Sequence, residues 1–151
     1  MRIKDIGFGM TVQDLNYMDL VPLYQLSKAL DYEFATATLH NSHYFHKLDN
    51  EIKLKEPVIK EFNKLINELL KSKRIKDWFR AYFNKGLINY IQGNRRELPC
   101  EMGRDGFFLD PYGDILACNG MDIKQPMGNI NTQSWDEIWN SEQAEKIRET
   151  V

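Results

Sequence analysis

The sequence predicts an α/β (α+β) protein, and three patterns carry the prediction. Near the N-terminus, an alternating segment and a segment rich in threonine and aromatic residues both predict strands, and a helical stripe lies between them. This is the order of a β-α-β unit with parallel strands. Two longer stretches with apolar residues at three- and four-residue steps then predict a pair of helices. A short hairpin pattern and a last helix complete the chain.

Composition limits the classes of protein to consider. The 151 residues are 42% hydrophobic and 28% charged with a net charge of −2, the profile of a globular domain without a field that attracts nucleic acid or anionic lipid. No apolar run reaches the roughly 18–20 residues that span a bilayer. The start lacks the apolar core of a signal peptide. We therefore expect a cytoplasmic protein with reduced thiols and with neither membrane nor nucleic acid as a partner.

The first strand is expected within residues 3–12, where "IKDIGFGMTV" alternates large apolar with small residues. The next helix is expected to begin near Asp19, because Pro22 is tolerated only in a first turn. "YEFATATLH" predicts a second strand over residues 32–40. "GFGMTV" is not a dinucleotide-binding loop, because Val12 takes the place of its third glycine and the glycines lie inside the strand.

The middle third predicts two helices, one opened by Pro57 and the other ending at Gly93. Residues 71–96 are basic and carry four closely spaced aromatic residues, a combination that can bind single-stranded nucleic acid. A core-facing stripe with a basic, solvated back explains the same residues. We expect the second arrangement, with the aromatic side chains turned inward.

The last third predicts a tight hairpin and a capped helix. Asp110 to Gly113 match a type I turn at each position. Ser134 and Glu137 form a capping-box pattern at the start of the helix.

The three histidines, His40, His43 and His46, recur at steps of three after the second predicted strand. Such steps place zinc ligands together on a helix. Here no carboxylate pattern accompanies them, so solvent-exposed loop histidines are the expected arrangement. Their position at the C-terminal end of a parallel strand is nonetheless where α/β proteins place ligands.

Cys100 and Cys118 flank the hairpin and are the two cysteines of the chain. Thiolates are soft ligands suited to zinc or iron–sulfur clusters. Two buried cysteines acting as small apolar residues would give the same spacing. On spacing alone both interpretations stay open.

The last fifty residues, read together, resemble the SPASM domain, a C-terminal extension of many radical S-adenosylmethionine (radical SAM) enzymes. Cys100, twelve residues, Gly113, four residues and Cys118 follow that family's opening pattern. "FFLDPYGDILACNG" is similar to its hairpin, and "MGNI" with "SWDEIWNSEQAEKIR" is similar to its next turn and helix. The resemblance is looser over the first forty residues, which look like the last β-α-β part of a partial TIM-like (β/α)₆ barrel.

The resemblance implies three domains: a barrel remnant at 1–50, a helical linker at 51–97 and a truncated auxiliary-cluster domain at 98–151. It makes Cys100 and Cys118 ligands of an auxiliary [4Fe–4S] cluster, with Gly113 close to that cofactor. The chain lacks the C-x-x-x-C-x-x-C loop of the barrel and the later cysteines of the extension. We therefore expect a fragment of a longer protein that also holds S-adenosylmethionine and a second [4Fe–4S] cluster.

The expected function is thus that of a piece of an iron–sulfur oxidoreductase, which would cleave S-adenosylmethionine and modify an unidentified peptide or small molecule by radical chemistry. The fragment alone is expected to be inactive, and 5′-deoxyadenosine production by it would contradict this. Its open barrel edge predicts self-association. The alternatives are a non-catalytic peptide- or partner-binding domain with structural cysteines, and a nucleic-acid-binding module that uses the 71–96 region.

Overall fold

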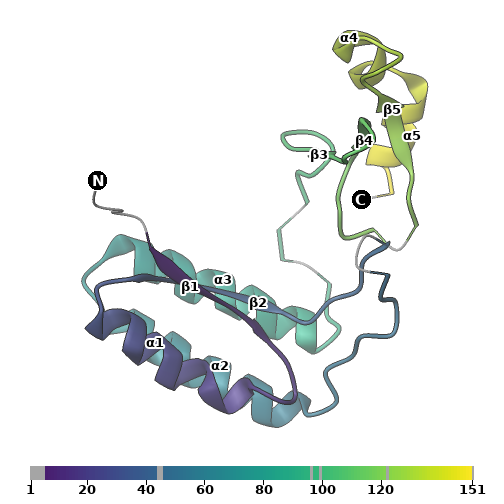
Figure 1. Cartoon of the computed structure of the whole chain (residues 1–151). Coiled ribbons are helices and arrows are strands. Elements are labelled where there is room, and N and C mark those ends of the chain that lie inside the picture. The colour runs from purple at the N-terminus through teal and green to yellow at the C-terminus, as the bar shows by residue number, and fades with distance from the viewer. Residues whose placement is uncertain (1–5, 44–45, 96, 99, 122, 151) are drawn as a thin grey trace. The chain divides into compact units, whose positions relative to one another are not determined.

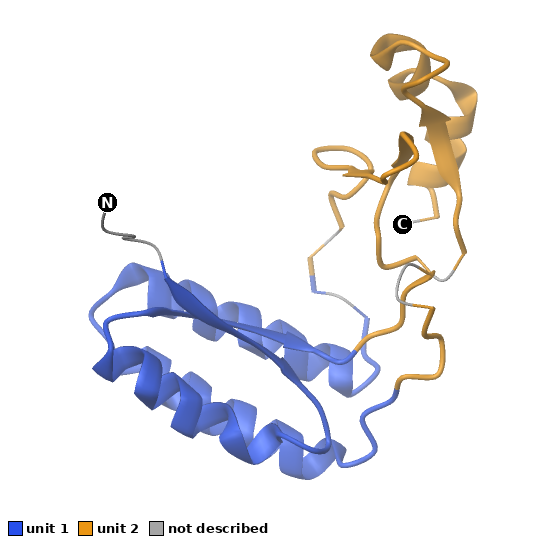
Figure 2. Ribbon diagram, viewed as in Figure 1, with its two compact units in different colours: residues 1–39, 51–97 blue, residues 40–50, 98–151 orange. Residues whose placement is uncertain are grey.

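The computed structural model describes residues 6–43, 46–95, 97–98, 100–121 and 123–150. Its contacts group the chain into two compact units, residues 1–39 with 51–97 and residues 40–50 with 98–151 (Figure 2). The helices and strands are mixed in both units, which confirms the α/β (α+β) class.

The first unit begins with the β-α-β arrangement that the sequence predicts (Figure 1). Strand β1 (Gly7–Val12) pairs in parallel with β2 (Glu33–Thr38), and helix α1 (Leu20–Ala29) connects them after a 3₁₀ turn at Tyr17–Asp19. The helix therefore starts one residue after the predicted position.

The two-stranded sheet has one buried and one open face. Met10, Val12 and Phe34 lie in the core, whereas Gly7, Gly9 and Ala35 are exposed. This alternation confirms the predicted strand pattern. Parallel sheets are usually covered on both faces, whereas in the described part of the chain this one is covered on a single face.

Helices α2 (Lys55–Leu70) and α3 (Ile75–Ile91) form the predicted pair and pack along each other. The buried stripe of α2 supplies much of the core: Val58, Phe62, Leu65 and Leu69. The expected inward direction of the aromatic side chains on α3 is wrong, because they are half or more exposed: Trp78, Phe79, Tyr82 and Phe83.

The reason is a second stripe on α3, also at four- and three-residue steps, which faces the core instead: Asp77, Ala81, Asn84, Ile88 and Ile91. Its small and polar members allow a close approach and a specific contact. The Thr36 hydroxyl donates to Asn84 Oδ1 (2.8 Å), and Asn84 Nδ2 donates to the Arg80 carbonyl (2.7 Å). A prediction that places the larger apolar side chains of a helix in the core therefore chooses the aromatic stripe, which the structure leaves exposed.

The second unit contains an antiparallel sheet in the order β3 (Phe108–Leu109), β4 (Asp114–Leu116), β5 (Pro126–Asn129). Two short helices, α4 (Trp135–Trp139) and α5 (Glu142–Arg148), follow it. A small core joins strands to helices: Ile115, Ala117, Met127, Ile138, Ala144 and Ile147. The predicted hairpin is confirmed, and the capping box of Ser134 and Glu137 is present in both directions.

The division into three domains at 1–50, 51–97 and 98–151 stays a prediction. By their contacts, residues 51–97 group with the β-α-β unit, and residues 40–50 group with residues 98–151. Among the helices described, none is long and apolar enough to cross a membrane.

Candidate functional site

The hairpin turn is fixed by the carboxylate of Asp110. Its Oδ1 accepts hydrogen bonds from the N–H groups of Tyr112 (2.8 Å) and Asp114 (3.0 Å), and the Gly113 N–H donates to the Asp110 carbonyl (3.1 Å). Gly113 has φ +87°, in the left-handed region where glycine is favoured. These bonds explain why the sequence turns sharply here.

Lys124 ties the loop after the hairpin to that turn. Its ammonium lies 2.7 Å from Asp110 Oδ2 and 2.5 Å from Asp114 Oδ2, and 5.6 Å from the centre of the Tyr112 ring. Burial raises the pKa of Asp110, but the hydrogen bonds from Lys124 and from two backbone N–H groups outweigh it and hold that pKa at about 2. The two carboxylates raise the pKa of Lys124. The loop that contains Cys118 is thus clamped by a charged network.

Gly113 lies before β4 and Cys118 after it, so the strand separates the two along the chain. Polar side chains surround Gly113: a Cβ at this position would lie 2.3 Å from Asn131 Nδ2. Asn131 and Asn129 both donate to the Tyr112 carbonyl, at 2.9 and 3.1 Å. The structure gives Gly113 a role in the turn, and its expected place beside a cofactor stays a prediction.

Cys118 follows β4 as a free, half-buried thiol. The N–H of Gly120 donates to its Sγ at 3.2 Å. Hydrogen bonds to ligand sulfurs are one means by which proteins tune iron–sulfur clusters. The sulfur is therefore reachable and already faces a backbone donor.

Cys100 is also free and half-buried. The turn that follows it folds back onto the strand that leads to Cys118, where a Cβ on Gly103 would lie 3.0 Å from the Cβ of Ala117. Gly103 has φ +85°, and its carbonyl accepts from Arg148 Nε at 2.7 Å. Helix α5 thus fixes the turn between the two cysteines.

Residues 40–43 and 46–50, which we call the strap, belong to the second unit and contact the Cys118 loop through Ser42 and His43. The buried Ser42 hydroxyl donates to the Asn119 carbonyl at 2.6 Å, and the His43 N–H donates to the Met121 carbonyl at 3.2 Å. His40 and His43 are half-buried and His46 is exposed, so the expectation of exposed loop histidines holds only for His46.

The strap could not be found from the sequence. It joins residues about 77 positions apart, and its sequence has neither strand nor helix periodicity. That Ser42 is buried is visible only in the structure.

The donor set available for a metal is small. Among the described residues, no three or more His, Cys, Asp or Glu side chains are grouped to hold a metal ion. Cys100 and Cys118 thus stand as a pair of thiols without a third ligand in the described part of the chain.

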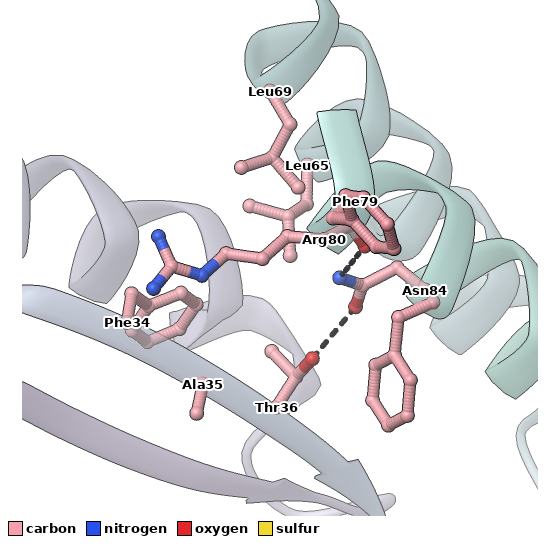
Figure 3. Close-up of a pocket in the computed structure, with 9 residues that line it drawn as sticks. Phe34, Ala35, Thr36, Leu65, Leu69, Phe79, Arg80 and Asn84 are labelled. Carbon is pink, nitrogen blue, oxygen red and sulfur yellow. Dashed lines mark hydrogen bonds between the residues drawn. The ribbon is translucent and has the colours of Figure 1, made fainter. Parts of the chain in front are cut away.

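The first unit holds a separate apolar pocket of about 340 Å³ between β2, α2 and α3 (Figure 3). Asn84 lines the pocket and is hydrogen-bonded to Thr36 and to the Arg80 carbonyl. Beside it, Glu33 accepts from Arg80, Arg74 and Lys76. The hydrogen bond from Arg80 is the main cause that lowers the pKa of Glu33 to about 2.

Comparison with known proteins addresses the second unit. Residues 100–151 match the family model of SPASM, described as an iron–sulfur cluster-binding domain. Searches of curated proteins and of solved structures gave no match. The C-terminal third therefore resembles a class of domain that binds iron–sulfur clusters. The β-α-β unit, the helix pair and the strap lie outside the matched region.

Proposed function

We propose that the second unit supplies part of an auxiliary [4Fe–4S] site in a radical SAM oxidoreductase, with Cys100 and Cys118 as two of the ligands. The proposal rests mainly on one observation: Cys118 is accessible, receives an N–H hydrogen bond from Gly120 and lies within the segment that matches the iron–sulfur domain. Two thiolates are half of the four that hold a [4Fe–4S] cluster.

The donor chemistry fits such a cluster in part. The sequence has two cysteines, so we propose that further ligands come from sequence outside these 151 residues. The bound cluster would supply electron transfer or a binding position for substrate. S-adenosylmethionine and its catalytic cluster would belong to the barrel of the same enzyme, to which the open parallel sheet of β1 and β2 would contribute.

The chain's own residues would shape the site. Lys124 and Asp110 would keep the hairpin and the following loop in one arrangement, because the buried carboxylate needs its cation. The strap would cover the Cys118 loop through Ser42. Both contacts would limit the access of water to the cluster and so affect its potential.

The test is anaerobic reconstitution of the full chain with iron and sulfide in the presence of a small thiol, which can complete the coordination. We expect iron and sulfide to be retained together with the visible absorption of a thiolate-bound cluster. Cys100→Ser and Cys118→Ser should each lower the retained iron severalfold. Ala29→Ser, an exposed position on α1 in the first unit and outside the segment that matches the iron–sulfur domain, is the matched control with a new serine.

Equal iron content in the wild type and in the doubly substituted chain would refute the proposal and favour structural cysteines in a partner-binding domain. No 5′-deoxyadenosine is expected from the reconstituted chain. Its formation would contradict the assignment of the catalytic cluster to other sequence.

A further inference from the structure

Helix α3 presents an apolar stripe to solvent. We define the α3 stripe by six positions that lie at three- and four-residue steps and are exposed: Ile75, Phe79, Tyr82, Phe83, Gly86 and Tyr90. Both Ile75 and Phe79 are 71% exposed, high values for such large side chains within a helix. Exposed apolar patches of this kind mark interaction surfaces.

The positions of the α3 stripe are arranged symmetrically about the middle of the stripe. Counting outward from the point between Tyr82 and Phe83, Phe79 lies as far from the centre as Gly86, and Ile75 as far as Tyr90. Two such helices packed antiparallel about a two-fold axis would place each residue opposite its counterpart. A two-fold interface requires this property, since the same patch serves both partners.

Gly86 supplies an independent argument. Glycine is among the poorest residues for a helix interior, yet no atom of the described residues lies within 4 Å of where its Cβ would be. Packing within the described part of the chain therefore gives no reason for a glycine. In the antiparallel pairing Gly86 lies opposite Phe79 of the other copy, where a missing side chain leaves room for a ring.

The available area suits a dimer. Because an aromatic side chain offers roughly 150–250 Å², the five large side chains at their exposures of 50–71% present on the order of 700 Å². Each partner of a standard interface buries about 800 Å². We infer that a second copy of this chain docks on the α3 stripe, antiparallel and with Phe79 against Gly86.

The charged residues beside the α3 stripe bear on how its binding depends on salt. Lys76 and Lys85 border the stripe and are exposed. In the antiparallel register they are level with Asn89 and Arg80 of the other copy, so the pairing gains nothing from opposite charges and depends on apolar contact. Because salt screens only charged contacts, the dimer should not weaken as the ionic strength rises, whereas binding to nucleic acid would weaken.

Sedimentation equilibrium of the full chain tests the inference. We expect a monomer–dimer equilibrium whose Kd rises at least tenfold with Phe79→Lys. Leu26→Lys is the matched control, since Leu26 is a 48% exposed apolar residue on α1, and it should leave Kd within twofold. Circular dichroism of each variant verifies the fold.

A mixing experiment tests the register. Phe79→Glu and Gly86→Lys should each dimerise poorly alone, because each alters both copies of the contact. Mixed, they should form a heterodimer in which the new acid faces the new base.

A chain that stays monomeric at several hundred micromolar would overturn the inference. So would a dimer that survives Phe79→Lys, which would point to the open strand edges instead. A monomer that binds an oligothymidine less tightly as salt rises would also overturn it and assign the stripe to nucleic acid.

Discussion

Replacement of Gly113 by alanine tests whether this residue serves the hairpin turn. The φ of +87° costs a non-glycine residue roughly 1–2 kcal/mol. The new Cβ would also lie 2.3 Å from Asn131 Nδ2, so the amide must move and give up its 2.9 Å bond to the Tyr112 carbonyl. A lost hydrogen bond of this kind costs about 0.5–1.5 kcal/mol.

One effect acts in the opposite direction. Alanine restricts the unfolded chain more than glycine does, which stabilises the folded state by about 0.4–1 kcal/mol. The net expectation for Gly113→Ala is a loss of about 1–3 kcal/mol in the free energy of unfolding of the second unit.

Urea unfolding followed by tryptophan fluorescence measures this loss. Trp135 and Trp139 both belong to the second unit, and Trp78 belongs to the first. A Trp78→Phe background therefore makes the fluorescence report on the second unit alone. Repeating Gly113→Ala together with Asn131→Ala removes the obstructing amide, so the cost should fall toward that of the backbone conformation alone.

Gly120→Ala is the matched control, because its φ is not in the left-handed region and its nearest neighbour, Cys118 Sγ, lies at an ordinary 3.5 Å. It should change the stability by less than about 0.5 kcal/mol. An unchanged stability in Gly113→Ala would refute the reasoning. Strict additivity with Asn131→Ala would refute the steric part of it.

Three further predictions concern polar contacts. The pKa of Asp110 is about 2 against an ordinary 3.8, so its contribution to the stability of the second unit is complete above about pH 4 and is lost as the pH falls through 2. Lys124→Met should therefore move the acid unfolding midpoint of the second unit to higher pH. An unchanged midpoint in a fluorescence titration would contradict this. Asn84→Ala should lower the urea stability of the first unit, measured by circular dichroism, by about 1–3 kcal/mol, because the buried Thr36 contact is lost. Glu33→Gln should cost under about 1 kcal/mol in the same assay, since its ion pairs are exposed to solvent, and a larger loss would show a stronger network.

The sequence determined the elements whose signals are local. Alternation within residues 3–12 and the threonine and aromatic residues of 32–40 predicted two strands, and Pro22 limited the helix between them. The Asp110–Gly113 turn and the Ser134 cap depend on side chains that bond to backbone a few residues away. The spacing of Cys100, Gly113 and Cys118, read together with the hairpin residues and the helix that follows, indicated the iron–sulfur resemblance that the family model matches.

Tertiary structure alone decided which stripe of α3 is buried and which segments accompany the Cys118 loop. Both stripes repeat at helical spacing, and it is the packing of α3 on α2 and β2, with the Thr36–Asn84 hydrogen bond as part of it, that places the smaller, more polar stripe in the core. The contact of Ser42 with Asn119 joins residues far apart in the chain, so no local sequence pattern predicts it. Hydrogen bonds and packing between distant segments depend on which segments the fold brings together. The periodicity of one segment gives no information about its partners in the tertiary structure.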